Sequence, residues 1–206
     1  MSDRTDAPAP AATDRGRRRR EAVLDAAALL FRERGFHGVS VDDLGASAGI
    51  TGPGLYRHFA SKDAVLMAVL DRLWQQLRPA LDRARELPSD EAVTVLLDAQ
   101  LDLALHQPEA IVVLVRELRH LPDDYRERAS RNHDRWVSAW AEAIGQLAPH
   151  LDVEVARAVA VSVHGLIDAA ALYTDPDVSP LGADQRRTLL EQLAWGALRA
   201  AGVAMG

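Results

Sequence analysis

The 206-residue chain contains no cysteine, so disulfides and thiolate metal or redox sites are excluded. Lysine is nearly as scarce, because Lys62 is the single lysine among the 24 basic residues. No uninterrupted apolar run approaches the about 18 residues that a membrane span requires. The N-terminal stretch also lacks the apolar core of a secretion signal. We therefore expect a cytoplasmic protein with no membrane partner.

The composition is that of a folded globular protein, with 48% hydrophobic and 26% charged residues. Proline and glycine separate long segments rich in Ala, Leu, Arg and Glu, and alternating strand patterns are missing. The sequence predicts an all-α fold of about nine helices, in which a connector helix joins a three-helix head to a helical bundle. The long predicted helices, apart from the connector, cover residues 17–34, 90–106, 109–120, 123–147, 152–173 and 184–203.

Local signals fix the ends of the elements in the head. Gly35 is a stop for the first helix, and Ser40 with Asp43 forms a capping-box-like start for the second. Gly49 permits a chain reversal, and Pro53 suits the first position of a third short helix. The predicted organisation is a disordered tail at 1–14, a helix-turn-helix domain at 15–62 and a helical domain at 63–206.

Charge is distributed unevenly along the chain. The net charge is -6, but residues 15–62 carry nine basic and five acidic side chains, a net of +4, so the remaining residues sum to -10. A basic end on an otherwise acidic protein is typical of a polyanion-binding segment. Two short helices separated by a glycine-containing turn fit the helix-turn-helix geometry that reads the major groove of DNA.

The same residues resemble the DNA-binding signature of TetR-type (TetR/AcrR) transcriptional regulators. The resemblance covers residues 17–66 and is most specific in Leu-Tyr-Arg-His-Phe at 55–59, Ser-Lys-Asp at 61–63, and Phe31 with Gly35. It implies a homodimer that binds a palindromic DNA operator and releases it on binding a small-molecule effector.

By this resemblance, Thr51, Gly52 and Pro53 form the base-facing start of the recognition helix. The positions that align with common phosphate contacts are Ser40, Tyr56, His58 and Lys62. The chain departs from the commoner pattern with Gly-Pro-Gly at 52–54, where a polar or basic residue often stands. Direct hydrogen-bond readout from these three residues is therefore sparse, and we expect Arg57 to supply part of the specificity.

A run of arginines precedes the first apolar stripe. Cations near a helix N-terminus oppose the helix dipole, so an external anion would explain them, although a solvated helix start is an equal alternative. With a flexible segment before them, Arg17, Arg18 and Arg19 are predicted to form an arm that enters the narrow minor groove of DNA.

Downstream residues suggest an effector pocket and a dimer seam. Abundant aliphatic residues favour an apolar or amphipathic effector of acyl or drug-like type. The candidate pocket residues are Trp74, His133, Trp136, Trp140, His164 and Asp168. The candidate dimer residues are Val163, Ile167, Leu189, Leu193 and Ala197. In both cases the competing interpretation is ordinary core packing within one subunit.

Two alternative functions remain open at this point. An enzyme would use His164 with Asp168, or Glu117 with His120, as acid and base. No nucleophile, metal-binding or phosphate-loop motif accompanies these pairs, so we expect no catalytic residue, metal or cofactor. The other alternative is a helix-turn-helix DNA-binding protein that responds to no effector.

Overall fold

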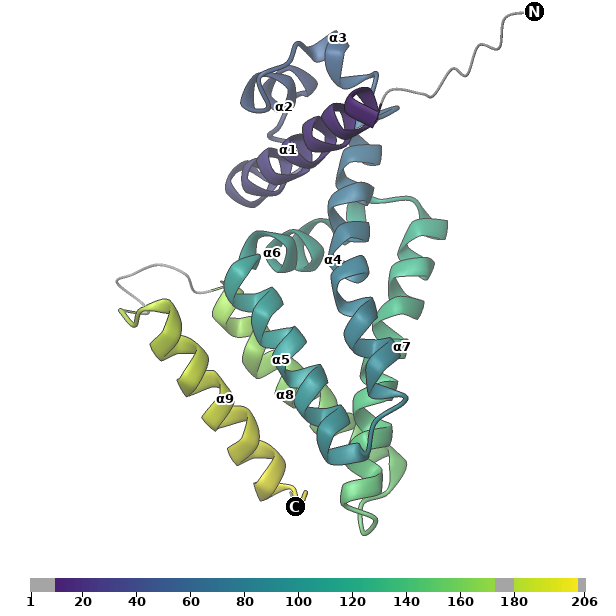
Figure 1. Cartoon of the computed structure of the whole chain (residues 1–206), viewed down its shortest axis with the longest axis vertical. Coiled ribbons are helices and arrows are strands. Elements are labelled where there is room, and N and C mark those ends of the chain that lie inside the picture. The colour runs from purple at the N-terminus through teal and green to yellow at the C-terminus, as the bar shows by residue number, and fades with distance from the viewer. Residues whose placement is uncertain (1–9, 173–179, 204–206) are drawn as a thin grey trace, which may run out of the picture. The chain divides into compact units, whose positions relative to one another are not determined.

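The computed structural model describes residues 10–172 and 180–203 (Figure 1). Within these ranges the chain forms nine α-helices and one 3-10 helix, with no strand, so the predicted all-α fold is confirmed. The chain divides into two compact units, Met1–Val69 and Leu70–Gly206. The division falls inside α4 (Lys62–Ala84), which is the predicted connector helix.

The first helix is longer than the sequence pattern predicts. Helix α1 (Pro10–Arg34) begins at Pro10, so residues 10–14 of the predicted disordered tail are helical, whereas residues 1–9 lie outside the described residues. Proline is well accommodated at a first helical position, and the alanines that follow have high helix propensity without forming an apolar stripe. At the other end, Gly35 adopts a φ of 70° and its N–H donates to the Phe31 carbonyl at 2.9 Å, as the predicted stop requires.

The next two helices are short and separated by a tight turn. Helix α2 (Val41–Ser47) starts with the predicted capping box between Ser40 and Asp43. Gly49 then takes a φ of 65°, which is the predicted reversal. Helix α3 (Gly52–Leu55) has Pro53 at its second position rather than its first.

The core of the first unit joins these helices. Side chains from α1, α2 and α3 and from the start of α4 are buried together with Phe59, and α1 packs on α2 while α2 packs on α3. The large buried side chains are Leu24, Phe31, Phe36, Leu44, Leu55, Phe59 and Leu66. Leu55 and Phe59 thus fasten α3 from behind, as their spacing predicts.

The second unit contains the end of α4 and five further α-helices. These are α5 (Ser89–His106), α6 (Pro108–Glu117), α7 (Asp123–Leu147), α8 (Val153–Leu172) and α9 (Ala183–Ala200), with the 3-10 helix η1 (Leu118–His120) after α6. The predicted bounds agree within three residues, and the predicted helix end at residue 173 lies outside the described residues.

Helix α8 is central to this unit. It contacts α5, α6, α7 and α9, and α5 also packs on α7 and α9 (Figure 1). Its length and hydropathy alone would suffice to cross a bilayer, a property that no other described helix has. Because one face packs against four helices through Ala156, Ala160, Val163 and Ile167, we interpret α8 as a bundle helix.

Candidate DNA-binding surface and effector cavities

The outer face of α3 and the turn after it present a compact set of exposed side chains. Thr51, Pro53 and Arg57 are exposed, and Tyr56 is 56% exposed although it is aromatic. Arg57 has no ion-pair partner among the described residues. These are the side chains that the first unit offers to a partner at this helix.

Gly52 departs from its predicted role, because it is buried rather than base-facing. A Cβ atom at this position would clash with Oδ1 of Asp42 in α2. Any other residue at position 52 would therefore have to displace the end of the Asp42 side chain, whereas the Asp42 Cα would lie 3.8 Å away, an ordinary contact distance. Gly52 itself has no side-chain group to offer to DNA.

Two hydroxyl groups predicted at this surface act as helix caps. Thr51 Oγ1 accepts a hydrogen bond from the Gly54 N–H at 3.2 Å. Ser40 Oγ accepts from the Asp43 N–H at 3.0 Å and donates its own proton to the Asp43 carboxylate at 2.5 Å. The bond from Ser40 Oγ to this carboxylate, and next the bond from the Ser40 backbone N–H to it at 2.8 Å, lower the pKa of Asp43. Ser40 can therefore donate to a phosphate only by exchanging its bond to Asp43, whereas the proton of Thr51 is not used by its cap.

Lys62 has a different role in the structure from the predicted phosphate contact. Its Nζ donates to the carbonyl oxygens of Phe36 and Val39, both at 2.8 Å, and lies 4.3 Å from the centre of the Phe36 ring. The ammonium group is thus engaged by the loop between α1 and α2. We interpret Lys62 as a structural residue that fastens this loop to α4. His58, another predicted phosphate contact, is half-buried beside the exposed Arg57.

The predicted minor-groove arm also needs correction. Arg17, Arg18 and Arg19 are exposed, but they lie in the second and third turns of α1, since this helix begins at Pro10. A continuous helix points successive side chains in different directions and cannot enter a groove as an extended arm. The guanidinium carbon of the next arginine, Arg20, lies 4.9 Å from the centre of the Phe59 ring.

In the second unit, His164 is enclosed by aromatic side chains. Its ring stacks on Trp136 with centroids 6.0 Å apart, and Trp140 meets it edge-on at 5.5 Å. His133 lies 6.3 Å away. Burial, and next the neighbouring His133, lower the pKa of His164 to about 3, so the ring is neutral at physiological pH. Its Nε2 and the Nε1 of Trp140 are buried without a hydrogen-bond partner among the described residues.

Asp168 does not pair with His164, although the two are four residues apart. Its carboxylate accepts from Gln100 Nε2 at 2.5 Å, and Gln100 Oε1 accepts from Trp136 Nε1 at 3.1 Å. Burial outweighs this hydrogen bond and raises the pKa of Asp168 to about 6. This chain of polar side chains therefore joins α8, α5 and α7.

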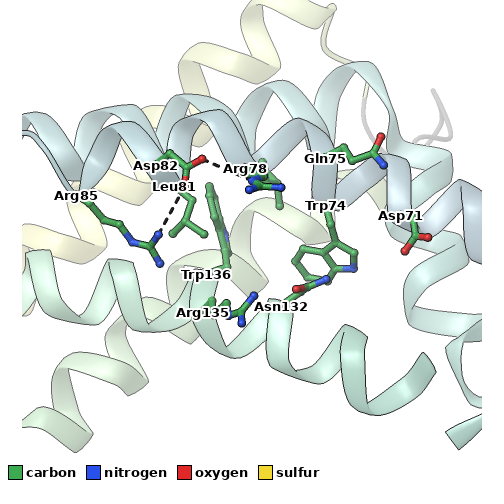
Figure 2. Close-up of a pocket in the computed structure, with 11 residues that line it drawn as sticks. Asp71, Trp74, Gln75, Arg78, Leu81, Asp82, Arg85, Asn132, Arg135 and Trp136 are labelled. Carbon is green, nitrogen blue, oxygen red and sulfur yellow. Dashed lines mark ion pairs between the residues drawn. The ribbon is translucent and has the colours of Figure 1, made fainter. Parts of the chain in front are cut away.

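Two cavities lie beside this polar chain. The first, of about 540 Å³, is a groove between α4 and α7 whose lining includes Trp74 and Trp136 (Figure 2). The second, of about 530 Å³, lies among α4, α6 and α7, and its lining includes Trp74 and His133. Of the predicted pocket residues, Trp74, His133 and Trp136 line these cavities. Trp140, His164 and Asp168 lie behind them and line neither.

Comparisons with known proteins decide the family. Residues 23–69 match the family model described as bacterial regulatory proteins, tetR family. The transcriptional repressor KstR2 of Mycolicibacterium smegmatis is 32% identical over 148 residues, which are 66% of this chain and 71% of that protein. The chain belongs to the TetR family of transcriptional regulators.

Solved structures of TetR-family and related regulators share the fold. The ketosteroid transcriptional regulator KstR2 of Mycobacterium tuberculosis aligns with a TM-score of 0.74 at 22% identity, covering 88% of this chain and 94% of that one. AibR, solved in complex with isovaleryl coenzyme A and operator DNA, aligns with a TM-score of 0.69 at 21% identity, covering 84% and 97%. TetR-family proteins are regulators and not enzymes, so the two predicted acid–base pairs are not interpreted as catalytic. One of these pairs is close in the structure, with His120 Nε2 3.7 Å from Glu117 Oε2.

The residues predicted for the dimer seam of this TetR-family chain separate into two groups. Val163 and Ile167 are fully buried inside one subunit, so they cannot supply a surface. Leu189 and Leu193 on α9 are 43% and 47% exposed, and Ala197 is half-buried. The stripe on α8 is therefore used within the subunit, and the stripe on α9 remains accessible.

Sequence patterns missed two further polar groups of the second unit. Gln100 is buried on the apolar face of α5, and its position between Leu97 and Leu101 is a signal that could have been used. The other group is a cluster in which Tyr125 donates to Asp71 at 3.1 Å and Arg128 lies 3.3 Å from the same carboxylate oxygen. Burial, and then Asp71, raise the pKa of Tyr125.

Proposed function

We propose that this chain is a homodimeric, cytoplasmic repressor that binds a palindromic operator and leaves it when a small apolar or amphipathic effector binds. In this proposal residues 15–62 form the DNA-binding domain and residues 63–206 the effector-binding and dimerisation domain. The family membership and the name of the repressor KstR2 support this function. AibR, which binds both isovaleryl coenzyme A and operator DNA, supports an acyl-type effector.

The observation that carries the DNA-binding part is the exposed face of α3. Thr51, Pro53, Tyr56 and Arg57 point away from the buried Leu55 side of the helix. Tyr56, with its exposed side chain, would contact phosphate, and such contacts position a protein on DNA without reading sequence. Arg57 carries several donors on an exposed side chain and is the strongest candidate for base contact.

The effector part is carried by the cavity of about 530 Å³ among α4, α6 and α7. Its wall contains Leu114, Leu118 and Ala129 together with polar side chains, and an apolar wall with polar groups that orient a ligand is typical of small-molecule sites. The polar side chains are those of Arg119, Arg126, Ser130 and His133. For the dimer, the exposed leucines of α9 are the surface that two copies would bury against each other.

The test is selection of bound fragments from the genome of the source organism with the purified chain. We expect wild type to enrich one palindromic sequence, and Arg57→Ala to lose about tenfold or more of the preference for it over unrelated DNA. Arg131→Ala is the control, because Arg131 lies on α7 and forms an ion pair with the exposed Glu127. Absence of any enriched palindrome would overturn the proposal.

A second experiment distinguishes this proposal from the alternative of a DNA-binding protein that responds to no effector. Operator complexes are titrated with a panel of acyl-coenzyme A thioesters and free fatty acids. We expect at least one member to release the operator and to raise the melting temperature of the free protein. Operator binding that persists throughout the panel, with no thermal stabilisation by any member, would favour a regulator that responds to no effector.

A further inference from the structure

The groove between α4 and α7 has a chemistry of its own. Three arginines line it: Arg78 on α4, Arg85 in the turn that follows α4, and Arg135 on α7 (Figure 2). Arginine presents planar, divergent N–H donors that match phosphate oxygens, and it does so better than lysine. The groove encloses about 540 Å³, which is enough for a substantial anionic group.

The carboxylates in the same groove neutralise these arginines only in part. Arg78 and Arg85 share one carboxylate, Asp82, at 3.6 and 3.5 Å. Asp71 is already engaged by Tyr125 and Arg128. Arg135 has no ion-pair partner in the described part of the chain. Three guanidinium groups against the one available carboxylate leave two positive charges in excess.

This local excess runs against the charge of its surroundings. The chain outside residues 15–62 carries a net charge of -10, so repulsion from the rest of this part disfavours a general polyanion surface. A positive groove set in an acidic domain favours a small ligand with a compact negative charge. Two excess charges match a phosphate ester dianion.

Trp74 connects the groove to the apolar cavity. It lines both, and its Nε1 is buried without a hydrogen-bond partner among the described residues. A ligand that crosses Trp74 would have an anionic end among the arginines and an apolar end against Leu114 and Leu118. A buried indole N–H at the crossing is available to a ligand carbonyl or ester oxygen.

We propose that the α4–α7 groove binds the phosphate-bearing end of an amphipathic ligand whose apolar end occupies the cavity among α4, α6 and α7. This rests on the proposed function in that the ligand is the effector, and it assigns Arg85 and Arg135 as the residues that select a phosphate ester over an uncharged or monocarboxylate compound. The shared chemistry is a phosphate ester, carried either by a coenzyme A thioester or by a simpler phosphorylated metabolite.

The test is calorimetric titration of the full chain, at fixed ionic strength, with coenzyme A, isovaleryl coenzyme A, pyrophosphate and isovalerate. We expect both coenzyme A compounds to bind and isovalerate alone to bind far more weakly. Arg135→Gln and Arg85→Gln should each weaken coenzyme A binding about tenfold. The matched control is Arg131→Gln, one helical turn from Arg135 and outside the groove, which should stay within about twofold of wild type.

The arms identify the source of the phosphate. If pyrophosphate binds as tightly as coenzyme A and with the same arginine dependence, the groove serves a simpler phosphorylated ligand and the phosphate assignment stands. Failure of coenzyme A and pyrophosphate to bind at millimolar concentration overturns the proposal, as does equal affinity in the Arg135→Gln and Arg131→Gln variants.

Operator binding without ligand separates this inference from the proposed function. We expect Arg85→Gln and Arg135→Gln to bind the operator as wild type does, and to need about tenfold more coenzyme A thioester for release. A chain that binds coenzyme A through Arg135 but enriches no palindrome would overturn the proposed function and leave the groove assignment intact.

Discussion

Asp168 is a partly buried carboxylate that weakens the fold at neutral pH. Among the described residues its carboxylate accepts one side-chain hydrogen bond, from Gln100 Nε2, and no cation faces it. Burial raises the pKa of Asp168 from 3.8 to about 6 despite that bond. We predict that Asp168→Asn stabilises the protein, because asparagine keeps an oxygen acceptor for Gln100 and carries no charge.

The magnitude follows from linkage between protonation and folding. The native state binds the proton of Asp168 more tightly than the unfolded chain, so this group's contribution to the free energy of unfolding falls as pH rises from about 4 to about 6. The difference between 3.8 and about 6 corresponds to a penalty of about 3 kcal/mol, fully present at pH 8. At pH 5 the penalty is about half as large. Asp168→Asn should gain these amounts over wild type.

His164 titrates in the same region with the opposite sign. Its pKa is lowered to about 3, so the unfolded chain binds the proton more tightly and the stability from His164 is lost as pH falls below about 6.5. This loss is common to wild type and Asp168→Asn. The difference between the two proteins at each pH therefore isolates the carboxylate, while either pH curve alone would not.

The assay is urea unfolding of both proteins at pH 8 and pH 5. One protein concentration is used throughout, because the stability of the proposed dimer would depend on concentration. The control is Glu127→Gln, whose side chain is exposed and paired on the surface, and it should change the free energy of unfolding by less than about 0.5 kcal/mol at either pH. The reasoning is refuted if Asp168→Asn is no more stable than wild type at pH 8, or if its advantage is the same at pH 5.

Two further predictions concern the head and the dimer. Lys62→Met should lower the free energy of unfolding by about 2 kcal/mol, because it removes two hydrogen bonds. The slope of the salt dependence of binding to unrelated DNA should not change. A slope smaller by about one would show that Lys62 does contact phosphate. Leu193→Glu should leave the subunit folded, because the side chain is 47% exposed, and should produce monomers in sedimentation; a fully dimeric variant would place the seam elsewhere.

The parts of the fold that sequence predicted are those fixed by local chemistry. Gly35 and Gly49 occupy positive φ angles at the expected helix end and turn, and Ser40 with Asp43 forms the expected cap three residues apart. Each of these signals acts within one helical turn. The start of α1 at Pro10 was missed because a polar, alanine-rich segment has helix propensity but no apolar period to reveal it.

The site residues that sequence could not assign depend on contacts between distant segments. Lys62 reaches carbonyls 26 and 23 residues away, and Gln100 meets Asp168 across 68 residues. A four-residue spacing suggested a pair of His164 with Asp168, yet spacing shows only that two residues share a helix face. Which partner each side chain takes depends on the packing of α5 and α7 against α8.

The structure narrows the source of operator specificity to very few side chains. In the Gly-Pro-Gly segment, Gly52 is buried against Asp42, and Gly54 has no side chain and gives its N–H to the Thr51 cap. Pro53 is exposed but has no donor, so it can add only apolar contact with a base. Arg57 therefore has the largest hydrogen-bonding capacity on this face. If Arg57 reads bases in each subunit of the proposed dimer, the rest of the selectivity must come from DNA shape and from the spacing of the two half-sites. We therefore predict that operator mutations that alter this spacing weaken binding more than most single base changes do.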